Sequence, residues 1–343
     1  MSPAGEPVLA QLGAASSIVL VRLRSLGDTV LATPAFTMLR RAVPNAVIHV
    51  VMDRKFAGVL AGNPDIDGVL EASAPAGALA KAGLVRRIRA LRPGLCVDMH
   101  GGSTGAWLTA LSGARWRAGS AHFRHSWAYN ERIPRAQEVL RRPPASTVHT
   151  AEHHAAMMIH LGVPDDEIPP ARLDAEPALD RPGYAVLHVG AAYHTKRWAV
   201  EHFRAVATEI KRVHGLEAVF VAGSGDTVPE DRLSGFEIRA GLSLAALKSL
   251  LAGAELFVGN DSGPAHVAAA FGVPCVVIFG SSDSAVWHPW KTAHRVVETD
   301  WDCKPCPGDR CYAFDEPRCI LSVEPGAVLL AVADLLADSR GAT

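Results

Sequence analysis

The chain lacks features that would place it in several large classes of protein. It has no apolar run long enough to span a membrane, and residues 1–17 carry no basic segment followed by an apolar core, the pattern of a secretory signal. Its formal net charge of −1 gives no overall attraction to nucleic acid. We therefore expect a globular cytoplasmic protein with no nucleic-acid partner.

Two glycine-rich phosphate motifs are also missing. No G-x-G-x-x-G follows the first strand predicted in either half of the chain, and no G-x-x-x-x-G-K-[ST] segment occurs. The first absence argues against a dehydrogenase and the second against a P-loop ATPase. A nucleotide must therefore be bound by other groups.

Cysteine is sparse outside one segment. Of the six cysteines, Cys96 and Cys275 lie in apolar, strand-like runs and are predicted core residues. The other four follow the spacing C-x2-C-x4-C-x7-C, at Cys303, Cys306, Cys311 and Cys319. This spacing does not match a two-knuckle zinc ribbon, so we favour reduced thiols or a redox-dependent link over a structural metal.

The 343 residues predict two domains, each with alternating strands and helices. Apolar runs such as I-V-L-V-R-L and L-C-V-D-M-H in the first half, and Y-A-V-L-H-V-G and L-F-V-G-N in the second, are each followed by a helical pattern. This alternation is typical of parallel sheets with helices on both faces. We predict an α/β protein of two doubly wound, Rossmann-like domains that face a central cleft.

The domain boundary is predicted from composition. Residues 163–182 contain five prolines and many acids, as linkers do. The expected organisation is a loose lead-in over 1–17, a domain over 18–172, a linker over 173–182, a second domain over 183–323, and a C-terminal helix and tail over 324–343.

The stretch from Leu256 to Phe279 is the most informative. Between two predicted strands, a G-N-D-S-G-P turn opens a helix, and Pro264 suits its first turn. The unbonded N–H groups and the helix dipole at that end attract anions. With Asp261, Ser262 and His266 beside it, the turn is either the capped start of a buried helix or a cradle for nucleotide phosphates.

Two further loops in the second half point to the same edge of the sheet. Lys196, next to Thr195, follows the first strand and can approach a phosphate as a point charge. Asp226 follows another strand and can accept hydrogen bonds from ribose hydroxyls. Their convergence with the turn at Asp261 predicts a site for a nucleotide diphosphate.

In the first half, Asp28 lies at a strand-to-helix junction, where open α/β sheets bind ligands. Its carboxylate can remove a proton from an attacking hydroxyl, or it can be the N-cap of a helix over 29–41. Asp98 and His100 follow another strand at the same edge, where Asp98 is either a site residue or a helix cap.

Two segments of the first half are basic. The arginines of a helix predicted over 80–92 are interpreted as a solvated face. Residues 115–142 combine arginine, histidine and aromatic side chains, which bind anionic sugars by forked hydrogen bonds and ring stacking, or form an irregular surface.

Three motifs carry a resemblance to a known family: I-V-L-V-R-L-R-S-L-G-D-T-V-L-A-T-P-A from Ile18, T-K-R-W-A-V-E-H-F from Thr195, and G-N-D-S-G-P-A-H-V-A-A-A-F-G-V-P from Gly259. Together they resemble the ADP-heptose:lipopolysaccharide heptosyltransferases, glycosyltransferase family 9, from Ile18 to about Leu336. The resemblance implies a GT-B fold, with the acceptor on the N-terminal domain and the nucleotide-sugar on the C-terminal domain. Many members carry Lys where this chain has Arg22.

The resemblance also implies transfer of a heptose from ADP-heptose to an inner-core acceptor, with inversion at the anomeric carbon. Asp28 would then be the base. The donor site would be lined by Thr195, Lys196, Asp226 (with Glu230 as an alternative), Asp261, Ser262, Gly263 and His266. We expect the acceptor to contact Arg24, Ser25, Asp98, His100 and Arg124.

The expected partners are an ADP-sugar donor and a lipid-linked saccharide acceptor, reached by a monomeric protein at the inner face of the cytoplasmic membrane. No cofactor is expected, and no metal, because a single Asp in the donor loop is not an Asp-x-Asp site. A transferase that uses another nucleotide-sugar or acceptor, and a non-catalytic nucleotide-sugar-binding protein, are the alternatives.

Overall fold

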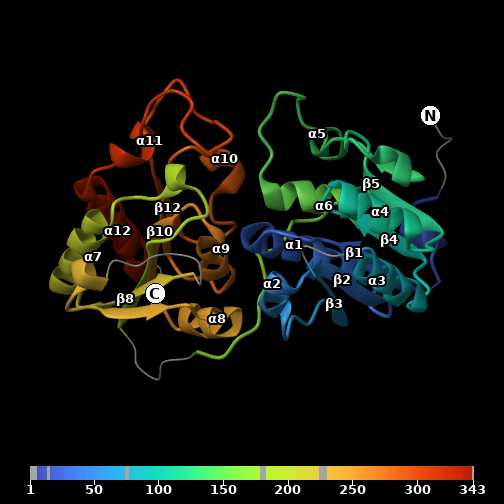
Figure 1. The fold of residues 1–343 in the computed structure, drawn as a ribbon, viewed down its shortest axis with the longest axis horizontal. Coiled ribbons are helices and arrows are strands. Elements are labelled where there is room, and N and C mark those ends of the chain that lie inside the picture. Colours follow the sequence, from blue (N-terminus) through green and yellow to red (C-terminus); the bar gives the residue numbers. More distant parts are fainter. Residues whose placement is uncertain (1–5, 14–15, 74–76, 178–182, 224–229, 342–343) are drawn as a thin grey trace. The chain divides into compact units, whose positions relative to one another are not determined.

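The computed structural model describes residues 6–13, 16–73, 77–177, 183–223 and 230–341. The chain divides into two compact units, Met1–Asp174 and Ala175–Thr343, which are described separately below. Each unit contains one six-stranded sheet in which all paired strands are parallel (Figure 1).

The sheet of the first unit has the strand order β3-β2-β1-β4-β5-β6. Its strands are β1 Ser17–Val21, β2 Val47–Asp53, β3 Gly68–Ala72, β4 Leu95–Asp98, β5 Trp116–Ser120 and β6 Glu131–Ile133. Its α-helices are α1 Leu26–Ala42, α2 Arg54–Ala57, α3 Ala78–Ala90, α4 Ser103–Leu111, α5 Ala136–Val139 and α6 Thr150–Leu161, and its 3-10 helices are η1 Val8–Gln11, η2 Gly58–Leu60 and η3 Ser126–Ala128.

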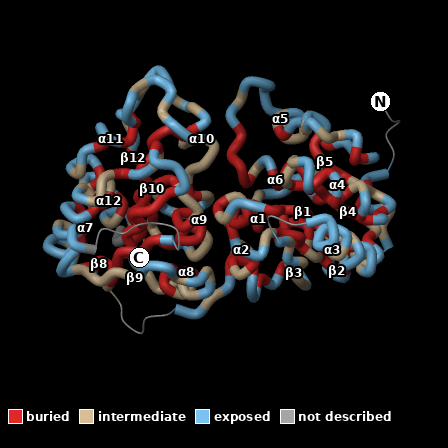
Figure 2. The backbone as a smooth tube through the Cα atoms, viewed as in Figure 1, coloured by how far each residue is buried: buried red, intermediate tan, exposed pale blue. Residues whose placement is uncertain are grey.

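Helices cover the first sheet, whose central strands β1 and β4 are mostly apolar. On one face, Leu84 and Ile88 of α3 and Leu108 of α4 pack against Val19, Val21 and Cys96 of the strands. Helices α1 and α6 pack against each other. Strands β1 and β4 are buried at nearly every residue, whereas β3 at the edge is mostly half-buried. Figure 2 shows α3 with an exposed side. Parallel strands covered on both faces are nearly all buried, which explains the apolar runs of β1 and β4.

Helix α1 carries a proline, Pro34, in its interior. Pro34 has no N–H, so the carbonyl oxygen of Val30 loses its usual donor. The Thr33 hydroxyl donates to that oxygen over 2.7 Å and replaces the missing bond. The helix therefore continues through Pro34 to Ala42.

The sheet of the second unit has the order β12-β11-β10-β7-β8-β9. Its strands are β7 Tyr184–His188, β8 Glu217–Ala222, β9 Glu237–Ala240, β10 Leu256–Asn260, β11 Cys275–Ile278 and β12 His294–Val297. Its α-helices are α7 Val200–His214, α8 Leu244–Ala252, α9 Gly263–Ala270, α10 Ser284–Trp287, α11 Arg318–Leu321 and α12 Pro325–Gly341, and its 3-10 helices are η4 His194–Lys196 and η5 Glu230–Leu233.

The core of the second unit lies between its sheet and helices α7 and α12. Phe203 and Val206 of α7 and Val328 and Val332 of α12 pack against alternate strand residues such as Phe220. Figure 1 shows both helices on the same side of this sheet.

The fold prediction is confirmed in both units. Counted in chain order, each sheet has the arrangement 3-2-1-4-5-6, the Rossmann order, in which ligands bind beyond the carboxyl ends of the strands. Within the segment expected as a loose lead-in, Val8 and Leu9 of η1 are buried. None of the described helices combines the length and apolar character that a membrane span requires.

Candidate functional site

In the first unit, the turn after β1 holds Asp28 in a fixed position. Helix α1 begins at Leu26, three residues earlier than the pattern suggested, and its N-cap is Ser25. The interpretation of Asp28 as an N-cap is therefore wrong. Asp28 is the third helical residue of a capping box, in which the Ser25 hydroxyl donates to Asp28 Oδ2 over 2.7 Å and the Ser25 N–H donates to the same oxygen over 3.4 Å.

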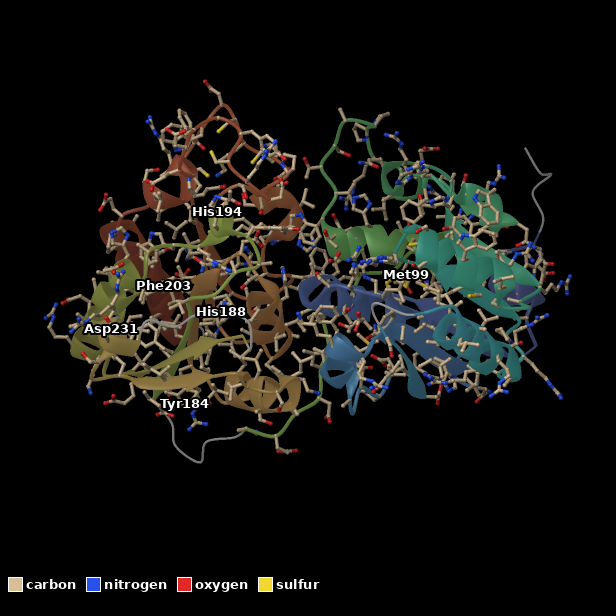
Figure 3. All side chains as sticks on the ribbon, in the orientation of Figure 1. Met99, Tyr184, His188, His194, Phe203 and Asp231 are labelled. Carbon is tan, nitrogen blue, oxygen red and sulfur yellow. The ribbon has the colours of Figure 1, made fainter. Side chains whose placement is uncertain are left out.

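The second carboxylate oxygen of Asp28 pairs with Arg22. Arg22 Nη2 lies 2.5 Å from Asp28 Oδ1, and Arg22 Nη1 donates to the carbonyl oxygen of Met99 over 3.0 Å. Figure 3 labels Met99, just beyond β4. Burial raises the pKa of Asp28, but the Arg22 guanidinium and the Ser25 hydrogen bonds outweigh it, and the pKa lies below its ordinary value. Asp28 is therefore a carboxylate at neutral pH, with a quarter of its side chain exposed.

Two histidines next to this pair have buried ring nitrogens with no hydrogen-bond partner in the described structure. Both nitrogens of His154 on α6 are in this state, and so is Nδ1 of His100. Burial and the nearby charge of Arg22 lower the pKa of both rings, that of His154 to about 3. The two rings are therefore neutral around Asp28, and Arg22 supplies the positive charge.

The carboxylate of Asp98, by contrast, is used in hydrogen bonds that stabilise the loop after β4. It is fully buried and accepts hydrogen bonds from the His100 N–H over 2.8 Å, the Gly101 N–H over 3.0 Å and the Tyr129 hydroxyl over 2.7 Å. A Cβ at Gly105 would lie 2.5 Å from Asp98 Oδ1, so α4 can approach this carboxylate only with glycine there. Asp98 thus holds His100 in place.

The remaining acceptor residues predicted in this unit are exposed. Arg24 and Ser25 lie at the start of α1, beside Asp28, and Arg124 lies in the loop between β5 and η3. Neither arginine forms an ion pair or hydrogen bond among the described residues. The structure therefore brings Ser25, Asp28, Asp98 and His100 to one edge of the sheet, while Arg124 forms no hydrogen bond or ion pair with them.

In the second unit, Lys196 and Asp261 meet at the carboxyl edge of the sheet. Lys196 Nζ lies 2.7 Å from Asp261 Oδ2, joining the turn after β7 to the turn after β10. The Ser282 hydroxyl, after β11, donates to the same oxygen over 2.5 Å. Asp261 is nearly buried, whereas Lys196 is about one-quarter exposed and can meet a ligand.

Asn260 ties the same two turns together from inside. Its Oδ1 accepts from the Trp198 N–H over 3.0 Å, and its Nδ2 donates to the carbonyl oxygens of Val189 and Gly190 over 3.0 and 3.2 Å. Asn260 is fully buried, so these bonds are protected from water. They hold Lys196 at a defined distance from the start of α9.

Helix α9 begins directly beside this pair. Ser262 is its N-cap, and Gly263 and Pro264 are its first residues. No side chain caps the helix; instead, the Ser262 hydroxyl lies 3.1 Å from Nδ1 of His188, which Figure 3 labels on β7. Pro264 has no N–H, and the Ala265 N–H donates to the carbonyl oxygen of Ser262. The N–H groups of Ser262 and Gly263 are therefore the ones that can meet an anion at this end of α9. His266 is buried one turn further on.

Thr195 is buried, and its hydroxyl donates to the carbonyl oxygen of Gly308. The Ser281 hydroxyl donates to Thr195 Oγ1 over 3.2 Å, and the Cys306 N–H donates to the Ser281 carbonyl oxygen over 3.0 Å. The cysteine segment is thereby attached to the loop that holds Lys196. Asp226 lies outside the described residues, and the structure describes no side chain for Glu230.

The cysteines contain no disulfide among the described residues, and all six are free thiols. Cys96 and Cys275 are fully buried, as predicted. The other four line one small cavity of about 40 Å³, together with Thr195 and Ser281. No group of three or more metal-ligating side chains in a metal-binding arrangement occurs in the described part of the chain.

A larger cavity of about 320 Å³ opens beside Ser282, at the ends of β11 and β12. Its wall carries four carboxylates (Asp283, Glu298, Asp300 and Asp302), the indole of Trp301 and Lys304. Carboxylates accept hydrogen bonds from hydroxyl groups and repel phosphates. This cavity therefore suits a neutral, hydroxyl-rich group.

Sequence reasoning missed four of these residues. Arg22 had a detectable signal, since a charged residue inside an apolar strand-like run requires a partner. Asn260 and Ser282 follow predicted strands at the correct edge, and this position alone could have marked them. Nothing in the pattern distinguishes His154 from the other histidines of α6.

Comparison with known proteins places these features in context. A family model described as glycosyltransferase family 9 (heptosyltransferase) matches residues 82–313, more than half of the chain. The chain is 26% identical to lipopolysaccharide heptosyltransferase 3 of Escherichia coli, over 92% of this chain and 98% of that protein.

Two solved structures share the fold of the chain. One is a glycosyltransferase family 9 protein from Veillonella parvula, with a TM-score of 0.78 and 22% identity, covering 95% of this chain and all of that one. The other is the E. coli heptosyltransferase WaaC with ADP, with a TM-score of 0.72 and 20% identity, covering 93% of this chain and 99% of that one.

Proposed function

Since this chain belongs to glycosyltransferase family 9, the heptosyltransferases, we propose that it transfers a heptose from ADP-heptose to an inner-core saccharide of lipopolysaccharide, with inversion at the anomeric carbon. The observation that carries this proposal is the meeting of Lys196 and Asp261 at the uncapped start of α9. In a member of this family, that arrangement suits the diphosphate of a nucleotide-sugar.

Asp28 acts as the base. As the acceptor oxygen attacks the anomeric carbon, its proton passes to the Asp28 carboxylate, and the sugar–phosphate bond breaks on the opposite face of the ring. Arg22 and Ser25 hold the carboxylate ionised and aligned before the acceptor arrives. The acceptor is contacted by Arg24, Ser25, His100 and Arg124, while Asp98 positions His100.

The second unit stabilises the leaving diphosphate. Lys196 and the first N–H groups of α9, at Ser262 and Gly263, lie where negative charge develops on that group. Lys196 exchanges part of its contact with Asp261 for the phosphate oxygens. Thr195 and His266 complete the donor site, and Asp226 is proposed to bind the ribose.

These groups supply positive charge from the protein itself, so we propose transfer without a cofactor or essential metal. The thiols of Cys303, Cys306, Cys311 and Cys319 take a structural role in shaping the loop around Thr195. We further propose that the protein works as a monomer, at the inner face of the cytoplasmic membrane, on a lipid-linked acceptor.

The function is tested by turnover with a panel of nucleotide-sugars. We expect transfer from ADP-heptose to a heptose-deficient lipopolysaccharide acceptor, at undiminished rate in EDTA, and little or no transfer from UDP- or GDP-sugars. ADP should raise the melting temperature more than UDP or GDP, because a ligand stabilises the state that it binds. Preferred turnover of a UDP-sugar would identify a different transferase, and ADP-heptose binding without turnover would indicate a binding protein.

A further inference from the structure

The charge of the first unit is unevenly distributed along the chain. Residues 72–130 contain eight lysines and arginines but a single acid, Asp98, in a protein whose net charge is −1. Asp98 is fully buried, so it contributes no carboxylate to the surface. The surface formed by this segment is therefore cationic.

Half of these cations lie on one helix. Lys81, Arg86, Arg87 and Arg89 are exposed on α3, and Arg92 is exposed just after it. Arg87 donates only to the carbonyl oxygen of Glu71, and the other four form no ion pair among the described residues. An unpaired cationic helix face of this kind attracts anionic surfaces.

Helix α4 lies next to α3 on the same face of the sheet, because Leu84 and Ile88 of α3 and Leu108 of α4 share one core cluster. The ends of the two helices meet, since a Cβ at Gly113, just beyond α4, would lie 3.5 Å from Arg89 Nε. Figure 1 shows both helices beside β4. The cationic helix α3 and the uncharged helix α4 therefore form adjoining parts of one surface.

The α4 side of this surface is aromatic. Trp107 on α4 and Trp127 on η3 pack edge to face with ring centroids 4.9 Å apart, yet 54% and 52% of these residues remain exposed. Leu111 at the end of α4 is 46% exposed. Arg115 and Arg124 are exposed on the adjoining loops. Two half-exposed indoles beside unpaired arginines are typical of proteins that bind the interface of a bilayer.

We propose that this α3–α4 face, formed by Lys81, Arg86, Arg89, Arg92, Trp107, Leu111 and Trp127, docks the protein on an anionic phospholipid bilayer. The arginines bind lipid phosphates while the indoles and Leu111 enter the headgroup region. The inference rests on the proposed function in one respect, because a lipid-linked acceptor must be reached at a membrane. Nucleic acid would use the same cations but would not require two indoles to remain exposed.

The charge component is tested by sedimentation of the full chain with vesicles. We expect binding to vesicles of equal parts phosphatidylglycerol and phosphatidylcholine, and much weaker binding to phosphatidylcholine alone or at high salt. Each arginine near the surface contributes about fivefold in affinity, so Arg86→Gln with Arg89→Gln should weaken binding roughly 25-fold. Arg204→Gln, an exposed arginine on α7 of the second unit, is the matched control and should bind as wild type.

The indole component is tested separately. Trp107→Ala with Trp127→Ala should weaken vesicle binding by about tenfold or more at low salt, because the membrane contact of both side chains is lost. The same variant should lose the blue shift in tryptophan fluorescence that the wild-type protein shows with vesicles. Both side chains are half exposed, so the melting temperature should change little.

Three outcomes would overturn the proposal. The first is that the protein does not bind the anionic vesicles, and the second is that the indole variant binds them as well as the wild type. The third has two parts: a short DNA duplex displaces the protein from vesicles, and the indole variant still binds that duplex. An assay of transfer to a deacylated, water-soluble acceptor, which needs no membrane, distinguishes a failure of the docking proposal from a failure of the proposed function. The surface variants should retain that transfer, whereas its absence in the wild type would contradict the function and leave the docking result intact.

Discussion

The two units have the same strand order but differ in the polar chemistry of the turns that hold Asp28 and Lys196. The first unit gathers acceptors and neutral rings: the Asp28 carboxylate is held by one buried cation, Arg22, beside His100 and His154. The turns after β7 and β10 of the second unit present donors: Lys196 and the start of α9 lie beside the nearly buried carboxylate of Asp261.

This difference shows that the shared sheet topology determines where a ligand binds, whereas the residues of the turns determine the chemistry of the site. In both units the first strand ends in a turn at the switch point of the sheet, where ligands bind in such folds. In the first unit the residue fixed there is a carboxylate, the proposed base, and in the second it is an ammonium group. An edge rich in acceptors suits the nucleophile of a transfer reaction, and an edge rich in donors suits the departing anion.

The sharpest way to break the comparison is to neutralise Asp28, the proposed base. Asp28→Asn keeps the shape and the hydrogen bond from Ser25 but cannot accept a proton. We expect kcat to fall by a factor of about 10²–10⁴, the usual contribution of a positioned base. The Kd for ADP should stay within about twofold of wild type, since the donor residues belong to the other unit. Initial rates and calorimetric titration with ADP measure the two quantities.

Two controls make this result specific. Asp166→Asn, an exposed acid of the same unit, should leave kcat unchanged. Lys196→Met, unlike Asp28→Asn, should raise the Kd for ADP about tenfold or more because the diphosphate loses its charged partner. It should also lower kcat, because Lys196 is proposed to stabilise the charge that develops on the leaving group. Asp28→Asn with substantial turnover would remove Asp28 as the base.

Two glycine substitutions, one in each unit, test the same difference between the units and should have smaller effects than Asp28→Asn. Gly105→Ala forces a methyl group against Asp98, and Gly280→Ala forces one against the carbonyl oxygen of Thr195. Each should lower the free energy of unfolding by about 1–3 kcal/mol, the usual effect of overpacking. Gly105→Ala should lower kcat several-fold and spare ADP binding, whereas Gly280→Ala should weaken ADP binding about tenfold.

Gly326→Ala is the control for this pair, because a Cβ there meets no atom within 4 Å. It should leave kcat and ADP binding as in the wild type. If Gly105→Ala and Gly280→Ala affected both quantities equally, the division of roles between the two edges would be refuted. Chemical denaturation, initial rates and titration with ADP measure the three effects.

The smallest expected effect is on the pH dependence of transfer. The pKa of Asp28 is lowered overall, so its base form is present above that depressed value and is lost only as the pH falls through it. Wild-type kcat should therefore be as high at pH 5 as at pH 7. Arg22→Met removes the charge that lowers the pKa and leaves the burial that raises it.

In Arg22→Met, the acid limb of the kcat profile should accordingly move to higher pH, with activity at pH 5 several-fold below that at pH 7. The stability that the carboxylate contributes in the wild type, present above its unfolded pKa, should diminish in the same variant. The wild-type profile and the unfolding free energy at both pH values provide the reference. An unshifted acid limb would show that Arg22 does not set the ionisation of Asp28.

Much of the fold followed from the sequence because parallel strands buried on both faces leave an unmistakable apolar pattern. The edge residues Asp28, Lys196 and Asp261 followed as well, since each comes directly after such a run. Helix boundaries did not. Whether α1 begins at Leu26 or Thr29 depends on the hydrogen bonds of the capping box, which compete with other local hydrogen bonds. This boundary decides whether Asp28 is the N-cap or the third residue of the helix.

The sequence by itself determined two Rossmann-like units and the positions along the chain where polar groups leave each sheet, because periodicity and turn chemistry are local. Only the tertiary structure decided which of these groups meet. Lys196 contacts Asp261 from 65 residues away, and Tyr129 contacts Asp98 from 31 residues away. Such pairs depend on strand order and register, which join distant turns at one edge and which no local pattern encodes.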